Sequence, residues 1–374
     1  MPHPIGSTPR RLASSFALLS LSLCLLTGCP WLGSEQSGQP QAPVVHYEDT
    51  LVKTVAGSVP GYFDGAAAEA KFYSPAGLAL DASGNLYVAD TGNHCVRMID
   101  AAGHVSTIAG STNGGLDVTP DRNLPFSSAL GLAIASGSTV FVADANGNCV
   151  RSIDASRSVT TYAGGAQGYA NGPRETARFF LPLDIAADAA DNLYLTESNS
   201  IRKITPQGQV STLVGGPHRL LGLPIEPASG LIAAADFRGI AADKSGNVYV
   251  ADRSSSRILK VTAGGEVSVL AGGSPGYVDG TLAEARFNTP EDVALDAEGN
   301  LYVADSVNRA LRKITPEGVV TTLAGKRHGG RPTVFEGKGA DVHFGSPSHL
   351  AVDASGSLFV TDAGANLIRV VRKN

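Results

Sequence analysis

The chain has 374 residues, of which 43% are apolar, 17% are charged and 44 are glycine, and its formal net charge is −5. This length suits one large domain or several small ones, and the composition is typical of a loop-rich β protein rather than a helical bundle or a disordered chain. The mildly acidic balance gives no indication of the strongly basic face that nucleic-acid binding requires.

The first 29 residues have the order of features found in an export signal. Arg10 and Arg11 precede an apolar run, residues 12–26, that is short for a membrane span. The sequence "LTGC" that ends at Cys29 resembles the lipobox of bacterial lipoproteins, which implies cleavage before Cys29 and lipid on its sulfur. An ordinary signal peptide or a retained anchor is the alternative. We predict a signal peptide over residues 1–28.

Residues 29–46 are predicted to be a lipidated cysteine and a flexible tether, because the segment is rich in Gly, Ser, Gln and Pro. Pro30 stands where Asp would favour retention in the inner membrane of lipoproteins of the enteric type. We therefore expect a protein of the bacterial cell envelope, lipid-anchored at the outer membrane or cell surface, with its body outside the bilayer.

Internal repetition dominates the remaining residues, 47–374. The phrase "VAD", or a close variant, recurs about every 54 residues. In the first copy the flanking pattern predicts four short strands, over residues 77–81, 86–90, 95–99 and 105–110. Six four-stranded units predict an all-β fold, a six-bladed β-propeller. The acid of the phrase is at Asp90, Asp144, Glu197, Asp252, Asp305 and Asp362.

The sixth copy lacks a fourth strand, since only "VVRKN" follows Arg369. A segment of the fourth-strand type, "TLVKTVAG" over residues 50–57, instead precedes the first copy. We predict that this N-terminal strand completes the last blade and closes the ring, which removes two exposed sheet edges.

The copies at residues 75–99 ("PAGLALDASGNLYVADTGNHCVRMI") and 290–314 ("PEDVALDAEGNLYVADSVNRALRKI") resemble the repeat of the NHL family. The resemblance covers essentially all of residues 47–374 and is weaker in the second and fourth copies. It implies a six-bladed propeller, but it implies no single function because propellers include enzymes, receptors and scaffolds.

Two repeated features are interpreted as structural. The acid of "VAD" recurs in every blade, and we expect it to bind turn N–H groups. The third-strand arginines are expected to pair with nearby acids between blades. These are Arg97, Arg151, Arg202, Arg312 and Arg369.

The connections between blades contain the element "GYFDGAAAEAKF" at residues 61–72, which recurs at 168–179 and 276–287 and in shorter form at 230–237 and 337–344. It predicts a tight turn, one helical turn and a Phe packed between blades. A calcium role for Asp64 or Asp279 is weak, because calcium takes six to eight oxygen ligands.

The informative positions are those where the first strands start, since the copies differ there. Blades one and two have small or apolar residues, whereas blades three to six have a contiguous polar arc at one mouth of the channel. Its members are Asp184, Arg238, Glu291, Asp292 and His349. A wet channel mouth that tolerates polar residues is the simpler explanation, and a ligand site is the functional one. Two carboxylates and an imidazole would suit calcium or zinc, and Arg238 would suit an anion.

Cys95 and Cys149 occupy the same position in adjacent blades, and we expect separate buried thiols because packed sheets lie too far apart for a disulfide. No Ser-His-Asp motif, nucleophile elbow or P-loop is evident. The leading hypothesis is a membrane-tethered extracytoplasmic binding module that presents one face to an envelope protein or small ligand. It would contact the membrane only through its lipid and bind no nucleic acid.

The alternative is a metal-dependent lyase or lactonase-like hydrolase with its site at the channel mouth, so enzyme activity stays open. Propeller lyases that resemble this architecture hold zinc with three His, and here only His349 is aligned with the channel. His94 precedes a third strand, while His328 and His343 are in a blade connection. RNA binding, known for some animal NHL proteins, is disfavoured by the acidic, exported chain.

Overall fold

The computed structural model describes residues 46, 48–110, 126–216, 235–326, 333 and 335–374. The predicted signal peptide, Cys29 and residues 30–45 lie outside these ranges. All described residues belong to one compact unit, Pro43–Asn374. Within the described ranges, the structure contains no helix that has both the length and the apolar character needed to cross a membrane.

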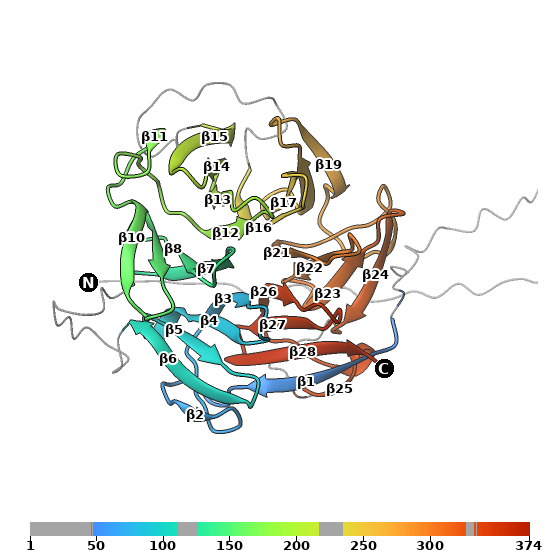
Figure 1. Cartoon of the computed structure of the whole chain (residues 1–374). Helices are drawn as coiled ribbons and strands as arrows, with labels where there is room; N and C mark the ends of the chain where they lie inside the picture. Colours follow the sequence, from blue (N-terminus) through green and yellow to red (C-terminus); the bar gives the residue numbers. More distant parts are fainter. Residues whose placement is uncertain (1–45, 47, 111–125, 217–234, 327–332, 334) are drawn as a thin grey trace, which may run out of the picture. The chain divides into compact units, whose positions relative to one another are not determined.

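Six antiparallel sheets form the blades of a propeller, as the repeats predict (Figure 1). The first strand of each blade contacts the first strands of both neighbouring blades, so these strands form a closed inner ring. They are β3 (Pro75–Leu80), β7 (Ala129–Ile134), β12 (Asp184–Ala187), β16 (Phe237–Ala242), β21 (Pro290–Leu295) and β26 (Pro347–Val352).

The second strand of each blade carries the "VAD" phrase and is almost wholly buried, because each blade packs between two others. These strands are β4 (Leu86–Asp90), β8 (Val140–Asp144), β13 (Leu193–Glu197), β17 (Val248–Asp252), β22 (Leu301–Asp305) and β27 (Leu358–Asp362). The third strands are β5 (Cys95–Ile99), β9 (Cys149–Ile153), β14 (Ser200–Ile204), β18 (Arg257–Val261), β23 (Ala310–Ile314) and β28 (Leu367–Lys373).

The fourth strands form the outer part of each blade. They are β6 (His104–Gly110), β10 (Val159–Gly164), β15 (Gln209–Gly215), β19 (Val267–Gly272), β24 (Val319–Ala324) and, in the last blade, β1 (Thr50–Ala56). β1 pairs antiparallel with β28, and Val52 of β1 is fully buried. The predicted ring closure by the N-terminal strand is therefore confirmed.

Four blades carry a fifth, two-residue outer strand that the sequence pattern did not predict. The blade connection runs outward, pairs with the fourth strand of the next blade, and then returns to the inner ring. These strands are β2 (Gly65–Ala66), β11 (Gly172–Pro173), β20 (Gly280–Thr281) and β25 (Gly337–Lys338). The short 3₁₀ segments η1 (Thr91–Asn93) and η3 (Gly339–Asp341) complete the described elements.

The repeated arginine of the third strand is buried between two aromatic rings in the same four blades. Arg97 lies 4.9 Å from the ring centres of both Tyr62 and Phe72. Its guanidinium donates to Asp90 (2.8 Å) and to Asp64, both in its own blade. The expectation that these arginines pair between blades is thus wrong. The connection folds back onto its own blade, and this brings its acid and its Phe to the arginine.

The acid of "VAD" binds backbone N–H groups, as expected. These N–H groups belong to the connection that leads into the first strand of the same blade, and not to the turn that follows the acid. The Tyr73 N–H donates to Asp90 (2.8 Å), and the Asn288 N–H donates to Asp305 (2.7 Å). Phe72 is fully buried in a cluster that joins Ala56 of the last blade to Val88 of the first, so the predicted Phe between blades is confirmed there. The acid and the Phe together fix where each connection enters the inner ring.

Candidate functional site

Two carboxylates join neighbouring inner strands at one mouth of the channel. Asp184, at the start of β12, accepts a hydrogen bond from the Ile240 N–H of the next blade (2.9 Å). Asp292 of β21 accepts one from the Leu350 N–H of the blade after it (2.7 Å). Both side chains are buried, with only 6% and 3% of their surface exposed. Each acid therefore links one blade to the next through the backbone.

Glycines in the preceding blades make room for these carboxylates. A Cβ at Gly131 would overlap the Asp184 carboxylate, and a Cβ at Gly239 would overlap Asp292 Oδ1. Because Gly239 is adjacent to Ile240, Asp184 and Asp292 lie on either side of the same short segment of β16. Gly131 and Gly239, which the sequence analysis did not select as site residues, are therefore part of the mouth.

Burial changes the protonation of this pair. Loss of hydration raises the pKa of Asp184 to about 7. The pKa of Asp292 is raised well above its usual range, first by burial and then by the negative charge of Asp184. When two carboxyl groups repel one another in a site without water, ionisation of both is disfavoured. At neutral pH the pair therefore carries fewer than two negative charges.

His349 lies in β26 at the position that aligns with Asp184 and Asp292. The backbone N–H of His349 donates to Thr361 Oγ1 (2.9 Å), and this bond fixes the backbone at His349. Burial and the positive charge of Arg238 lower the pKa of the imidazole to about 4. His349 is therefore neutral at pH 7, and its ring can both donate and accept a hydrogen bond.

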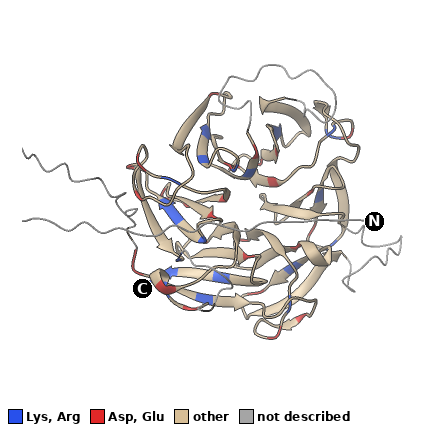
Figure 2. Ribbon diagram, turned by 180° about the vertical axis from the view of Figure 1, so that it is seen from behind, with Lys and Arg blue, Asp and Glu red and all other residues tan. Residues whose placement is uncertain are grey.

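A charged rim surrounds this buried group. Arg238 pairs with Asp236 (3.1 Å), and Arg253 pairs with Glu291 (3.0 Å). Arg253 also lies 3.8 Å from Asp236, so the four side chains form one network. Burial raises the pKa of Glu291, while the positive charges of Arg253 and Arg238 oppose that shift. In Figure 2, basic and acidic residues are both scattered over the ribbon.

Three polar atoms at this mouth are buried and have no hydrogen-bond partner among the described residues. They are Asp292 Oδ1, His349 Nδ1 and the Nε of Arg238. Buried polar groups in native proteins are almost always paired, and each exception calls for an explanation. Three exceptions on three adjacent inner strands indicate a place where a bound group would complete the hydrogen bonding.

The structure brings together all five predicted residues, in two layers. Asp184, Asp292 and His349 are inside the mouth, and Arg238 and Glu291 are at its rim. The prediction missed Asp236 and Arg253. Arg253 directly follows the "VAD" of blade four, where the other blades have Thr, Ala or Ser, so this departure was visible in the sequence.

No group of three or more His, Cys, Asp or Glu side chains in the described ranges is arranged to hold a metal ion. Asp64 and Asp279 are ion-paired with Arg97 and Arg312 of their own blades. Cys95 and Cys149 are free, buried thiols, as predicted, and burial raises the pKa of Cys149 to about 11.

The fold and the mouth define a six-bladed β-propeller with a polar site at one end of its channel. The family model described as "NHL repeat" matches residues 72–97, which run from Phe72 through β3 and β4 into β5. The chain is therefore a six-bladed β-propeller in which one segment matches the NHL repeat.

Two curated relatives are 28% and 29% identical to the chain over the aligned residues. Protein Suppressor of quenching 1, chloroplastic, of Arabidopsis thaliana is 28% identical over 84% of the chain and 26% of the relative. Human NHL repeat-containing protein 2 is 29% identical over 90% of the chain and 44% of the relative. The chain spans less than half the length of these relatives.

Solved structures share the fold at lower identity. An auxiliary nutrient binding protein from Bacteroides thetaiotaomicron superposes with a TM-score of 0.64 and 17% identity, over 87% of the chain and 77% of that protein. A virginiamycin B lyase from Staphylococcus aureus superposes with a TM-score of 0.53 and 11% identity, over 86% and 99%. At these identities the likeness concerns the fold alone.

Proposed function

We propose that the chain is an extracytoplasmic binding protein, tethered to the bacterial envelope through a lipid on Cys29, that binds a small polar ligand at the channel mouth. The observation that carries this proposal is the set of three unpartnered buried atoms of Arg238, Asp292 and His349. A ligand that hydrogen-bonds with them would offset the cost of burying polar atoms without partners.

The charges of the mouth favour one class of ligand. His349 is neutral at pH 7, the pKa of Asp292 is raised, and Arg238 is a cation. The inner surface therefore favours an anionic or uncharged hydroxylated molecule over an organic cation. A polar side chain of an envelope protein would offer the same groups. Calcium or zinc on Asp184, Asp292 and His349 is the other occupant to test.

The comparisons support a binding role without identifying the ligand. The Bacteroides thetaiotaomicron protein with the same fold is described as an auxiliary nutrient binding protein. A small polar molecule held at a channel mouth would fit that general role. The membrane tether is proposed from the N-terminal sequence alone.

Isothermal titration with glucose, gluconate, CaCl2 and ZnCl2 tests the site directly. Saturable heat with one of these probes, lost in Asp292→Ala while the fold is retained, is the expected result. Glu317→Ala is the matched control, because it removes an acidic side chain from an exposed turn of the same blade. If no probe binds and Asp292→Ala changes only the melting temperature, the carboxylates are purely structural and the binding proposal is wrong.

The second candidate is a lyase or lactonase-like hydrolase, with or without a metal ion. It is favoured by the pKa of Asp184, which is raised to about 7. A general acid or base works best when its pKa lies near the working pH. Incubation with a streptogramin and with gluconolactone separates this candidate from simple binding. Product should accumulate with the parent protein and not with Asp184→Asn.

A further inference from the structure

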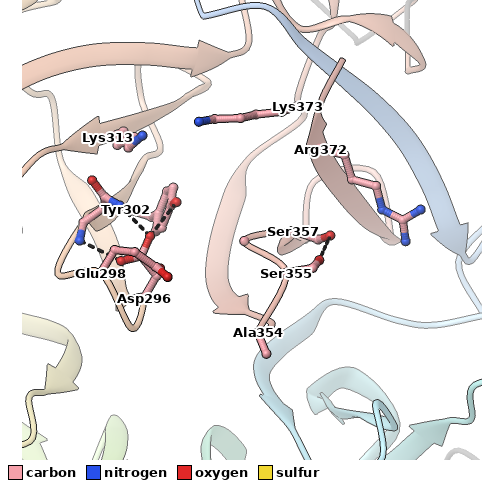
Figure 3. A pocket seen from close by; sticks show the side chains of 11 residues that line it. Asp296, Glu298, Tyr302, Lys313, Ala354, Ser355, Ser357, Arg372 and Lys373 are labelled. Atoms are coloured by element: carbon pink, nitrogen blue, oxygen red, sulfur yellow. Dashed lines mark hydrogen bonds between the residues drawn. The ribbon is translucent and has the colours of Figure 1, made fainter.

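A cavity lies between blades five and six, at the end of the strands opposite the channel mouth. Its volume is about 440 Å³, which is within the range of small-molecule sites. One wall is the hairpin between β21 and β22, with Asp296 and Glu298, and the other is the hairpin between β26 and β27, with Ser355 and Ser357. Figure 3 shows these walls facing one another across the cavity.

Two lysine ammonium groups converge at one side of this cavity. In Figure 3 the side chains of Lys313 and Lys373 are directed toward one another. The Lys313 side chain is only 12% exposed, and its Nζ lies 3.7 Å from Glu48 Oε1. Glu48 also accepts a shorter hydrogen bond from the Thr321 hydroxyl (2.8 Å). An ammonium group has three N–H donors, so the 3.7 Å contact with Glu48 leaves Lys313 with donors for an anion.

The basic side of the cavity is a departure from the repeat. The residue that follows Ile99 in blade one is Asp100, and the residue that follows Ile314 in blade five is Thr315. At the equivalent position the last blade has Arg372, followed by Lys373, because β28 continues as a strand where the other blades turn. The repeat therefore does not account for these two basic residues.

Of the two carboxylates in the acidic wall, Asp296 is hydrogen-bonded within its hairpin and Glu298 is exposed. Asp296 accepts hydrogen bonds from the Asn300 side chain (2.7 Å) and the Tyr302 hydroxyl (3.0 Å), which fix it in its hairpin. Glu298 is exposed at the rim. The cavity thus presents the exposed Glu298 carboxylate and two ammonium groups, whereas the hydroxyls of Ser355 and Ser357 are engaged with Asp353 and with each other.

From this arrangement we infer that the cavity binds a small zwitterion, with a phosphate between Lys313 and Lys373 and an ammonium group at Glu298. Phosphate suits the basic side because it offers several oxygens to two ammonium groups at once. Phosphoethanolamine has this chemistry, either as a free monoester or as the diester headgroup of a lipid. This inference is independent of the channel-mouth site.

Isothermal titration of the full chain in detergent with phosphoethanolamine tests the inference. Lys373→Gln should weaken binding about tenfold, the effect of losing one charge-assisted contact. Lys244→Gln is the control, since Lys244 is an exposed lysine in the hairpin between β16 and β17 of blade four and does not line the cavity. Glu298→Gln should remove the preference for phosphoethanolamine over inorganic phosphate, because only the former has an ammonium group.

Glycerophosphoethanolamine separates the two sources of the ligand. Tighter binding of this diester than of the monoester assigns the cavity to a lipid headgroup, and the reverse assigns it to a free metabolite. The inference is overturned if neither compound gives saturable heat at millimolar concentration. It is equally overturned if Lys373→Gln binds as tightly as the parent. Neither result would affect the channel-mouth titration.

Discussion

Val52 and Val371 are register partners in one sheet, although they come from opposite ends of the propeller sequence. Val52 has no exposed surface and Val371 has 3%. Thr50, two residues earlier, donates from its hydroxyl to the Leu323 carbonyl (2.5 Å) in the neighbouring blade. The joint between β1 and β28 is therefore buried and tied to the neighbouring blade.

We expect Val52→Ala to lower the free energy of unfolding by about 2 kcal/mol, because it removes two buried methyl groups and leaves a void. Lys53→Ala, at the exposed neighbouring position, should change it by less than about 0.5 kcal/mol. Urea unfolding followed by circular dichroism measures both. Equal midpoints for the two variants would show that the joint contributes little to stability.

Arg312 is one of the four third-strand arginines that are fully buried. It has no exposed surface, pairs with Asp279 and Asp305, and lies between Tyr277 and Phe287. We expect Arg312→Ala to cost about 3–5 kcal/mol, because it leaves two buried carboxylates without their cation. Arg174→Ala, which breaks the exposed pair with Glu175, should cost at most about 1 kcal/mol. Thermal unfolding of the two variants provides the comparison.

The channel carboxylates predict a specific pH dependence. The pKa of Asp184 is raised from 3.8 to about 7, so the folded protein binds this proton more tightly than the unfolded chain does. Its contribution to stability is fully present below pH 3.8 and is lost as the pH rises through 7. Between pH 4 and 8 the parent should therefore lose up to about 4 kcal/mol relative to Asp184→Asn.

Asp353→Asn is the control for this experiment. Burial opposes the shift, but hydrogen bonds from Ser355 and Ser357 lower the pKa of Asp353. The difference in stability between the parent and this variant should stay constant from pH 5 to pH 8. Denaturant titrations at several pH values measure both differences. A constant difference for Asp184→Asn as well would mean that its carboxyl is ionised normally in the folded protein.

The proposed lipid anchor has its own test. Cells that express the parent chain should incorporate radioactive palmitate into the protein, whereas Cys29→Ser should leave it unlabelled, because the sulfur is the proposed attachment point. Cys95→Ser is the matched control and should be labelled like the parent, since its thiol is buried. Continued labelling of Cys29→Ser would refute the assignment.

The repeat pattern predicted the strands and the closure well, because strand alternation and copy number are properties of the sequence alone. It failed for the partners of Arg97, since an alignment of copies says which residues recur and not which residues meet. It also missed β2, because two residues such as Gly65 and Ala66 are too short to show a period.

At the channel mouth, the prediction located the five polar residues because they interrupt the repeat. It assigned Arg238 to an anion, and in the structure Arg238 pairs with the carboxylate of Asp236. The hydrogen bond from the Leu350 N–H to Asp292 depends on the distance between blades, which no sequence pattern specifies. The raised pKa of Asp292 has the same origin, since burial is its main cause.

The connections between blades give the ring a period of two blades over most of its circumference. The full-length connection begins at Gly61, Gly168 and Gly276, ahead of blades one, three and five. In each case an arginine lies between a Tyr and a Phe, whereas the last blade has a shortened version with two Phe rings. Six blades of one topology are therefore not six equal units: the first, third and fifth carry the complete clasp on their outer edge, and the last carries a reduced one.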